Sequence, residues 1–510
     1  MNIKEAKNYI KDTVTLYLKK DEEGEYRIPV VRQRPVFLLG APGIGKTAIM
    51  EQIAQELGIA LVSYSMTHHT RQSALGLPFI THKEYEGTSY DVSEYTMSEI
   101  IASIYDVMAA SGIKEGILFL DEINCVSETL APSMLQFLQY KVFGRHSVPE
   151  GWVIVTAGNP PEYNKSVREF DVVTLDRMKI LEVEAEYEIW REYAKERGIH
   201  TAILNYLDMK KEDFYQVETT VRGKAYVTAR GWEDLSQMLL LYEEEGLAVE
   251  ETLVGQYLRN ARVAREFTAY YDLYQKYQND YRVEDILTGK VNEQVKDKAR
   301  KAGFDERLSL MGMLIDQIQQ EIRENMQTSA MLQELMNPLK ALKGKAQDGS
   351  ADEIRAMLGQ QVRARQQAYE SLLAAGALSL KEKKKSRRII GFLQAGEKML
   401  LTAKAQSGQQ AFDLMREKFD GQVEQYKEET KALQERLHYL FVFVEDTFGS
   451  GNEMLVLVTE CTVQADCAAF ISAYGCEDYA RHNEEMMLTE RGDVLREQIR
   501  ELSLSGTPEN

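Results

Sequence analysis

A glycine-rich stretch near the N-terminus ends in a lysine and a hydroxyl, which are residue types that bind phosphate and Mg²⁺. It reads Gly40-Ala41-Pro42-Gly43-Ile44-Gly45-Lys46-Thr47, continues into Ala48, and fits the spacing GxxxxGK[ST]. The backbone N–H groups of such a turn and the start of the following helix bind phosphate oxygens. Lys46 would reach the β and γ oxygens, and Thr47 would ligate Mg²⁺. Residues 40–48 therefore predict a nucleoside triphosphate site.

Two adjacent carboxylates follow an apolar run about 75 residues further along the chain. Ile117–Leu120 is followed by Asp121 and Glu122. At the end of a strand, Asp121 can hold Mg²⁺ through water, while Glu122 beside it can polarise an attacking water. Adjacent acids are common on protein surfaces, so this pattern gains weight only beside the phosphate loop. Together the two stretches predict a nucleotide-hydrolysing centre.

A polar amide follows the next apolar run. The segment Trp152–Thr156 leads into Ala157-Gly158-Asn159-Pro160. Asn159 would lie where the γ-phosphate and a water meet, and it would orient that water. The alternative is an ordinary Asn-Pro turn.

Short apolar strands alternate with amphipathic helices from Pro35 to Trp152, which is typical of a covered, mainly parallel sheet. The predicted strands are Val36–Leu39, Ala60–Met66, Ile117–Leu120 and Trp152–Thr156. The predicted helices are 3–19, Thr47–Leu57, Met97–Ala110 and Glu128–Tyr140, with Ser127 as the N-cap of the last. The first part of the chain is therefore expected to be an α/β domain.

The ordered motifs GAPGIGKT, LFLDEIN, VTAGNPPEY, LDRM and VTARGWEDL resemble those of AAA+ ATPases of the MoxR and dynein-related branch, over about residues 30–285. The resemblance implies a P-loop NTPase core with a helical lid, ATP and Mg²⁺ as ligands, and a homo-oligomeric, hexameric ring. It also implies that Asn159 is sensor 1, that Arg177 is the arginine finger, with Arg168 as the alternative, and that Arg230 is the sensor 2 arginine.

The same resemblance suggests what the protein acts with. Thr70–Pro78 is similar to a family loop that faces the client or the pore. MoxR-like ATPases act with proteins that carry von Willebrand factor A domains, so we expect a chaperone-like role toward a protein partner.

The chain is predicted to have four regions: 1–185 (α/β nucleotide-binding domain), 186–290 (helical lid), 291–445 (helical) and 446–510 (small and mixed). In the third region, large apolar residues recur every seven positions, at Phe412, Phe419, Tyr426, Leu433 and Leu440. They predict a long helix with a coiled-coil-like seam, packed either on its own chain or on a partner. In the fourth region, Met454–Val458 is predicted to be a short buried strand.

Composition narrows the class of protein. The chain has 510 residues and a net charge of −19, which argues against a surface built to coat nucleic acid. The N-terminus has no secretory pattern, and no apolar run approaches the ~18 to 20 residues of a membrane helix. We therefore expect a soluble, cytoplasmic protein. The four cysteines show no metal-binding spacing.

Three other functions compete with an ATP-driven remodelling machine. A GTP-driven motor is disfavoured because Asn164-Lys165-Ser166-Val167 lacks the final carboxylate of the guanine-reading NKxD. A DNA-acting motor stays an alternative because Lys381–Arg388 can contact phosphates, although such runs are usually solvated helix ends. A small-molecule kinase fits least, because residues 186–510 exceed what a substrate lid needs.

Overall fold

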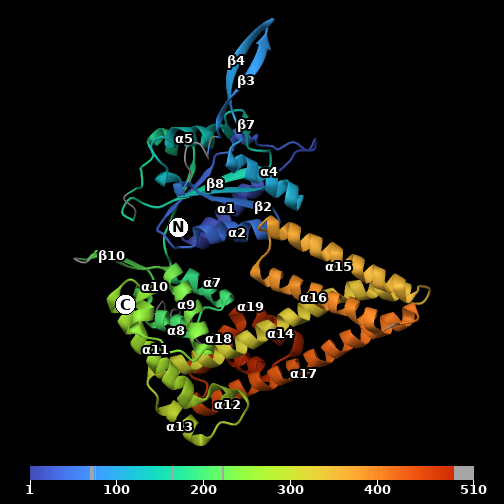
Figure 1. Ribbon diagram of the computed structural model, residues 1–510. Coiled ribbons are helices and arrows are strands. Elements are labelled where there is room, and N and C mark those ends of the chain that lie inside the picture. Colours follow the sequence, from blue (N-terminus) through green and yellow to red (C-terminus); the bar gives the residue numbers. More distant parts are fainter. Residues whose placement is uncertain (69–73, 75, 164–165, 221–222, 404, 487–510) are drawn as a thin grey trace, which may run out of the picture. The chain divides into compact units, whose positions relative to one another are not determined.

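The computed structural model describes residues 1–68, 74, 76–163, 166–220, 223–403 and 405–486 (Figure 1). The chain forms two compact units, each assembled from separate stretches of sequence. The first contains Met1–Glu196, Phe214–Asp234 and Gly359–Gln394, and the second contains Arg197–Asp213, Leu235–Leu358 and Ala395–Asn510. The domain boundaries expected from the sequence, at 185, 290 and 445, stay a prediction.

A five-stranded sheet forms the centre of the first unit. Its order is β2-β5-β8-β1-β9, and all neighbouring strands are parallel. The strands are β1 (Val36–Gly40), β2 (Ala60–Ser65), β5 (Gly116–Asp121), β8 (Trp152–Gly158) and β9 (Lys179–Val183). The four strands predicted from the sequence are confirmed to within two residues at each end, whereas β9 was not predicted. In a parallel sheet all carboxyl ends lie at one edge, so the polar residues after β1, β5 and β8 gather there.

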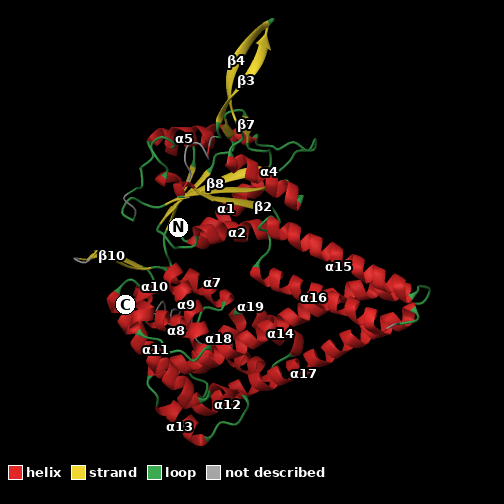
Figure 2. Ribbon diagram, in the orientation of Figure 1, coloured by secondary structure: helices red, strands yellow, loops and turns green. Residues whose placement is uncertain are grey.

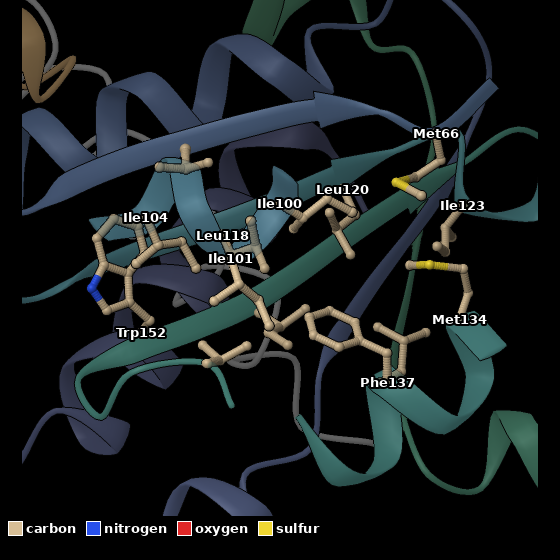
Figure 3. Packing of buried hydrophobic residues seen from close by; sticks show 14 of the residues in the cluster. Met66, Ile100, Ile101, Ile104, Leu118, Leu120, Ile123, Met134, Phe137 and Trp152 are labelled. Carbon is tan, nitrogen blue, oxygen red and sulfur yellow. The ribbon is translucent and has the colours of Figure 1, made fainter. Parts of the chain in front are cut away.

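Helices cover both faces of this sheet (Figure 1). On one face, α1 (Ile3–Tyr17) and α2 (Lys46–Leu57) pack with Ile117 and Phe119 of β5. On the other face, α4 (Glu99–Ser111) and α5 (Ala131–Tyr140) pack with Leu118 and Leu120 (Figure 3). Because side chains alternate along a strand, a continuous apolar run such as β5 supplies both cores.

The predicted start of α5 is wrong by three residues. The helix begins at Ala131 rather than Glu128, and Ser127 is not its N-cap. Instead the carbonyl of Ser127 accepts the N–H groups of Leu130 and Ala131 in a preceding turn. Pro132 lies in the first turn of the helix, where its missing N–H has no structural cost.

Among the described residues of the first unit, three antiparallel hairpins accompany the sheet (Figure 2). They are β3 (Pro78–Tyr85) with β4 (Thr88–Tyr95), β6 (Val142–Phe143) with β7 (His146–Ser147), and β10 (Gln216–Thr220) with β11 (Gly223–Val227). The side chain of Glu94 pairs with Lys83 of its own hairpin and with Arg145 in the β6–β7 turn. The open end of the first hairpin is thus joined to the turn of the second. The same unit contains α6 (Val172–Leu175) and all but the last residue of α7 (Tyr187–Arg197).

The second unit is helical (Figure 2). Its helices are α8 (Thr201–Met209), α10 (Glu251–Tyr257), α11 (Ala261–Tyr281), α12 (Val283–Leu287), α13 (Glu293–Lys301), α14 (Phe304–Ala346), α17 (Gly408–Phe448), α18 (Asn452–Val463) and α19 (Ala465–Tyr474). Helices α9 (Ala229–Glu244), α15 (Ala351–Ala374) and α16 (Leu380–Ala403) contribute residues to both units.

The predicted long helix is present as α17, and its seam packs on α14 of the same chain. The two helices are antiparallel, because Asn325 of α14 donates to Thr430 of α17 at 2.9 Å while the N–H of Gly408 reaches the carbonyl of Gly349 just beyond the far end of α14. Of the five seam residues, Phe412, Leu433 and Leu440 are buried, and Phe419 and Tyr426 are partly buried. The seam therefore belongs to the core of the second unit.

The strand predicted at Met454–Val458 is wrong, because these residues lie within α18. The described part of residues 446–510 is helical rather than mixed. Met454, Leu457 and Val458 face a core that also contains residues of α14, α17 and α19. An apolar run of this length fits a buried strand or a buried helix equally well, so periodicity alone does not separate them.

In the part of the chain that the structure describes, no single helix is both long and apolar enough to cross a membrane. Helices α18 and α19 meet the criterion only as a pair, bent by 89° at the break between them.

The seam generates a stability prediction. Leu437 of α17 is 1% exposed, so Leu437→Ala removes buried methyl groups and should lower the free energy of unfolding by ~2 to 5 kcal/mol. Lys431→Ala, at an exposed position of the same helix, should change it by less than about 0.5 kcal/mol. Chemical denaturation followed by circular dichroism measures both. A Leu437→Ala protein of unchanged stability but altered oligomeric state would instead place the seam against another chain.

Candidate functional site

The turn between β1 and α2 has a backbone that only glycine accommodates well. Gly43 and Gly45 have φ values of +77° and +95°. A side chain at Gly40 would place its Cβ 2.7 Å from the carbonyl oxygen of Val183 on β9. The spacing of glycines in the sequence is thus explained by left-handed backbone and by close packing. The turn delivers the chain to the N-terminus of α2, whose first N–H groups lack intrahelical partners.

Lys46 is the first residue of α2, and its charged end is buried. Its Nζ donates to the carbonyls of Gly40 at 2.7 Å and Ala41 at 2.8 Å, and to Oδ1 of Asn159 at 2.9 Å. Burial is the main cause that lowers the pKa of Lys46 to about 8, while Asp121 opposes this shift and Arg230 adds to it. Three neutral oxygens therefore hold a desolvated cation, which is an environment that favours an anionic ligand.

Asp121, the last residue of β5, faces the start of α2. The hydroxyl of Thr47 donates to its Oδ2 at 3.3 Å, and its Oδ1 accepts the N–H of Glu122 at 2.8 Å. Both side chains are half-buried. The structure thus brings the two predicted Mg²⁺ ligands together, as a hydroxyl and a carboxylate oxygen of the kind that Mg²⁺ prefers.

Glu122 has a strained backbone and a tethered carboxylate. Its φ of +55° lies in the left-handed region, which is unusual for a residue other than glycine. Its Oε2 accepts the hydroxyls of Ser65 and Thr67, each at 2.9 Å. Ser65 ends β2, and Thr67 lies in the short helix Met66–His68. The turn after β5 therefore points the carboxylate toward the end of β2.

Asn159 follows β8 and is held by a second asparagine. Asn124, in the turn Ile123–Cys125, donates its Nδ2 to the carbonyl of Asn159 at 2.8 Å. Asn124 is 4% exposed, and a Cβ added to Gly158 would lie 2.5 Å from its Oδ1. Asn124 thus fixes the backbone of Asn159, while the side chain of Asn159 meets Lys46.

Tyr215 and residues 228–230, which are distant in the sequence, pack against the phosphate loop. Tyr215 donates its hydroxyl to the carbonyl of Pro42 at 2.9 Å, and burial raises its pKa. A Cβ on Gly43 would lie 3.2 Å from Cβ of Thr228 and 3.5 Å from Cβ of Arg230. Arg230, in the first turn of α9, is exposed. The segment that contains Arg230 therefore lies against the loop, and its sensor 2 role stays a prediction.

The two candidate finger arginines lie away from the loop. Arg168 pairs with Glu128 at 2.5 Å. Arg177 follows α6, is exposed, and forms no ion pair among the described residues. It lines a small cavity with Thr174 and with residues of α5. Within the described part of the chain, neither arginine hydrogen-bonds to the phosphate loop of its own chain.

The comparisons with known proteins agree with this geometry. Residues 35–178 match the family model for an AAA domain of the dynein-related subfamily. This segment is an AAA domain. The match covers the phosphate loop, the acidic pair, Asn159 and both candidate finger arginines, whereas Arg230 lies beyond it. The comparison with curated proteins gives no match.

Three residues of the AAA domain site were missed from the sequence. Ser65, Thr67 and Asn124 make their contacts through a hydroxyl or an amide, and these residue types are common in any turn. Their positions at or shortly after the ends of β2 and β5 were the available signal, because such positions share one edge of a parallel sheet. Two other predictions fall outside the described residues: Thr70–Arg71–Gln72–Ser73 and Leu75 of the client-facing loop, and Asn164 and Lys165.

The contact between Gly158 and Asn124 can be tested by a double-mutant cycle. Gly158→Ala should lower the free energy of unfolding by ~1 to 3 kcal/mol because the new methyl group meets the amide of Asn124. Asn124→Ala should cost a similar ~1 to 3 kcal/mol because it leaves the carbonyl of Asn159 without its donor.

The double variant should then cost clearly less than the sum, since the added methyl group meets a smaller side chain. Thermal unfolding of the four proteins measures this coupling. Strict additivity would show that the two residues do not share a contact.

Proposed function

We propose that the protein is a Mg²⁺-dependent ATPase that works as a homo-oligomeric, hexameric ring and uses ATP hydrolysis to remodel a protein partner. The observation that carries this proposal is the convergence of Lys46, Asp121, Glu122 and Asn159 at one edge of the sheet of an AAA domain. Remodelling and a partner with a von Willebrand factor A domain rest on the resemblance of the motifs to MoxR-like proteins.

The residues divide into a group that binds and a group that acts during hydrolysis. Backbone N–H groups of residues 43–48 and the ammonium of Lys46 bind phosphate oxygens in place of the carbonyls and amide that Lys46 now contacts. Thr47 and Asp121 would hold Mg²⁺, which neutralises charge on the phosphates. This donor set fits the ion, since both ligands are hard oxygens.

Glu122 and Asn159 serve the water that attacks the γ-phosphate. A carboxylate released from the hydroxyls of Ser65 and Thr67 can accept a proton from that water. The amide of Asn159, positioned through Asn124, orients it. Arg230, beside Gly43, supplies positive charge from the lid segment.

A neighbouring copy supplies the remaining charge in this proposal. Arg177 is exposed and without an ion pair among the described residues, whereas Arg168 is engaged by Glu128, so Arg177 is the better candidate finger. Val172 and Val173, just before it, are 81% and 59% exposed. Exposed apolar residues beside an exposed guanidinium fit a surface that is covered on assembly.

The division of roles predicts opposite kinetic defects. Glu122→Gln should keep ATP affinity and lose most turnover, about 100-fold or more, because the carboxylate matters only when water attacks. Lys46→Ala should lose ATP binding itself. Titration with a fluorescent ATP analogue and a phosphate-release assay separate the two. Wild-type affinity in Lys46→Ala would contradict the assignment of the loop.

Assembly predicts complementation between two inactive chains. Arg177→Ala and Lys46→Ala should each be inactive, yet a mixture should regain part of the activity because one chain supplies the finger and the other an intact loop. Val172→Asp should raise the protein concentration needed for activity while leaving ATP affinity unchanged. Arg168→Ala is the matched control. Mixed with Lys46→Ala, it should give no more activity than wild type gives alone. Turnover that is independent of protein concentration would favour a monomeric nucleotidase.

A further inference from the structure

The hairpin formed by the end of α15 and the start of α16 carries a positive charge that the rest of the chain does not share. Residues 359–394 contain eight basic and two acidic residues, a net charge of +6 in a chain whose total is −19. Six of the eight basic residues lie between Lys381 and Arg388, within about 10 Å along the axis of α16. The basic residues are concentrated on one pair of helices in the first unit.

Several of these cations have no acidic partner. Arg363, Lys383 and Lys384 form no ion pair among the described residues. Of the two acidic residues, Glu382 accepts hydrogen bonds from the N–H and hydroxyl of Ser379 in a capping arrangement, and Glu370 accepts one from Gln366. The acids of the hairpin therefore serve local structure, and Arg363, Lys383 and Lys384 stay without an acidic partner in the described part of the chain.

This placement opposes the stability of α16. Cations at the N-terminus of a helix face the positive end of its dipole, and like charges three and four residues apart repel each other. Lys381, Lys384 and Arg388 fall at such intervals, as do Lys381 and Lys385. A run of like charges that weakens the helix carrying it is expected at a functional surface.

The hairpin is also held rigidly by the AAA domain. The N–H of Leu61 on the edge strand β2 donates to the carbonyl of Ala375 at 3.0 Å, and Gln55 of α2 donates to the carbonyl of Leu378 at 3.3 Å. Ala375 and Ala377 are buried in the core that contains α4 and α5. The tip of the hairpin is therefore part of the AAA core, and the basic helix that leaves it is presented in a fixed position.

We propose that this basic hairpin is a docking surface for an acidic, partly apolar segment of a partner protein. The apolar requirement comes from Leu372, Leu373 and Leu380, which flank the turn and are 36%, 41% and 62% exposed. A lipid surface fits less well, because Ile389, Phe392 and Leu393 of α16 are buried in the protein. A long nucleic acid fits less well, because it would run beyond the basic hairpin onto a chain that is otherwise strongly acidic.

The test measures binding of a fluorescein-labelled, 15-residue peptide of alternating Glu and Leu pairs to the full chain in the absence of nucleotide. Arg363→Glu/Lys383→Glu/Lys384→Glu should weaken binding about tenfold or more. Lys340→Glu/Lys343→Glu/Lys345→Glu on α14 makes the same change in net charge at residues that are also without ion pairs among the described residues, and it should stay within about twofold of wild type.

The thermal stability of the same proteins serves as a control for misfolding. Replacing lysines by glutamates near the N-terminus of α16 improves the interaction with the helix dipole, so the hairpin variant should unfold at the wild-type temperature or above it. Lost binding with retained stability supports the docking surface.

Three outcomes overturn the proposal. Equal loss in the two triple variants would show that only net charge matters. Tighter binding of a 20-nucleotide oligo-dT than of the peptide, abolished by the hairpin variant, would make the surface a nucleic-acid site. If polyglutamate binds as tightly as the Glu/Leu peptide, the partner needs no apolar residues. Because the assay contains no nucleotide, none of these results bears on ATP hydrolysis.

Discussion

The AAA domain is organised around one buried cation. Lys46 brings a positive charge into a site where two backbone carbonyls and the amide of Asn159 are its hydrogen-bond partners, and burial lowers its pKa to about 8. Holding a charge in this way costs stability unless an anion arrives. The surrounding elements make the arrangement possible: glycines let the loop wrap around the ammonium, β8 delivers Asn159, and Asn124 fixes the backbone behind it.

Much of this architecture could be predicted from the sequence because burial on both faces of a parallel sheet leaves a strong pattern. The runs that became β1, β5 and β8 are apolar apart from Thr156 and from Asp121 at the end of β5, and the residues of the site lie at or directly after their ends. A glycine motif is equally readable, since left-handed backbone at Gly43 and Gly45 admits few other residues. Ser65 and Asn124 could not be read in the same way, because their roles depend on neighbours that only the folded sheet supplies.

The other wrong or missing predictions have a common physical cause. A local sequence pattern does not show which distant segments of the chain pack together. Strands β3 and β4 are exposed on most of their residues, so they carry no burial signal. Residues 454–458 pack on three other helices, and an all-apolar run satisfies that environment as a helix. The turn at Ala375 belongs to the AAA core although more than 200 residues separate it from β8, and no property of its own sequence marks the contact.

The edge strand β2 contacts both the basic hairpin and the carboxylate of Glu122. At its start, Leu61 donates to Ala375 of the basic hairpin, and at its end Ser65 donates to the carboxylate of Glu122. The two residues are about 13 Å apart along one extended strand, whose other side is paired with β5 from Ala60 to Ser65. An edge strand normally leaves alternate N–H groups to solvent, so the hairpin satisfies a donor that would otherwise be open to another chain. Through these hydrogen bonds at its two ends, β2 connects the hairpin with the carboxylate of Glu122.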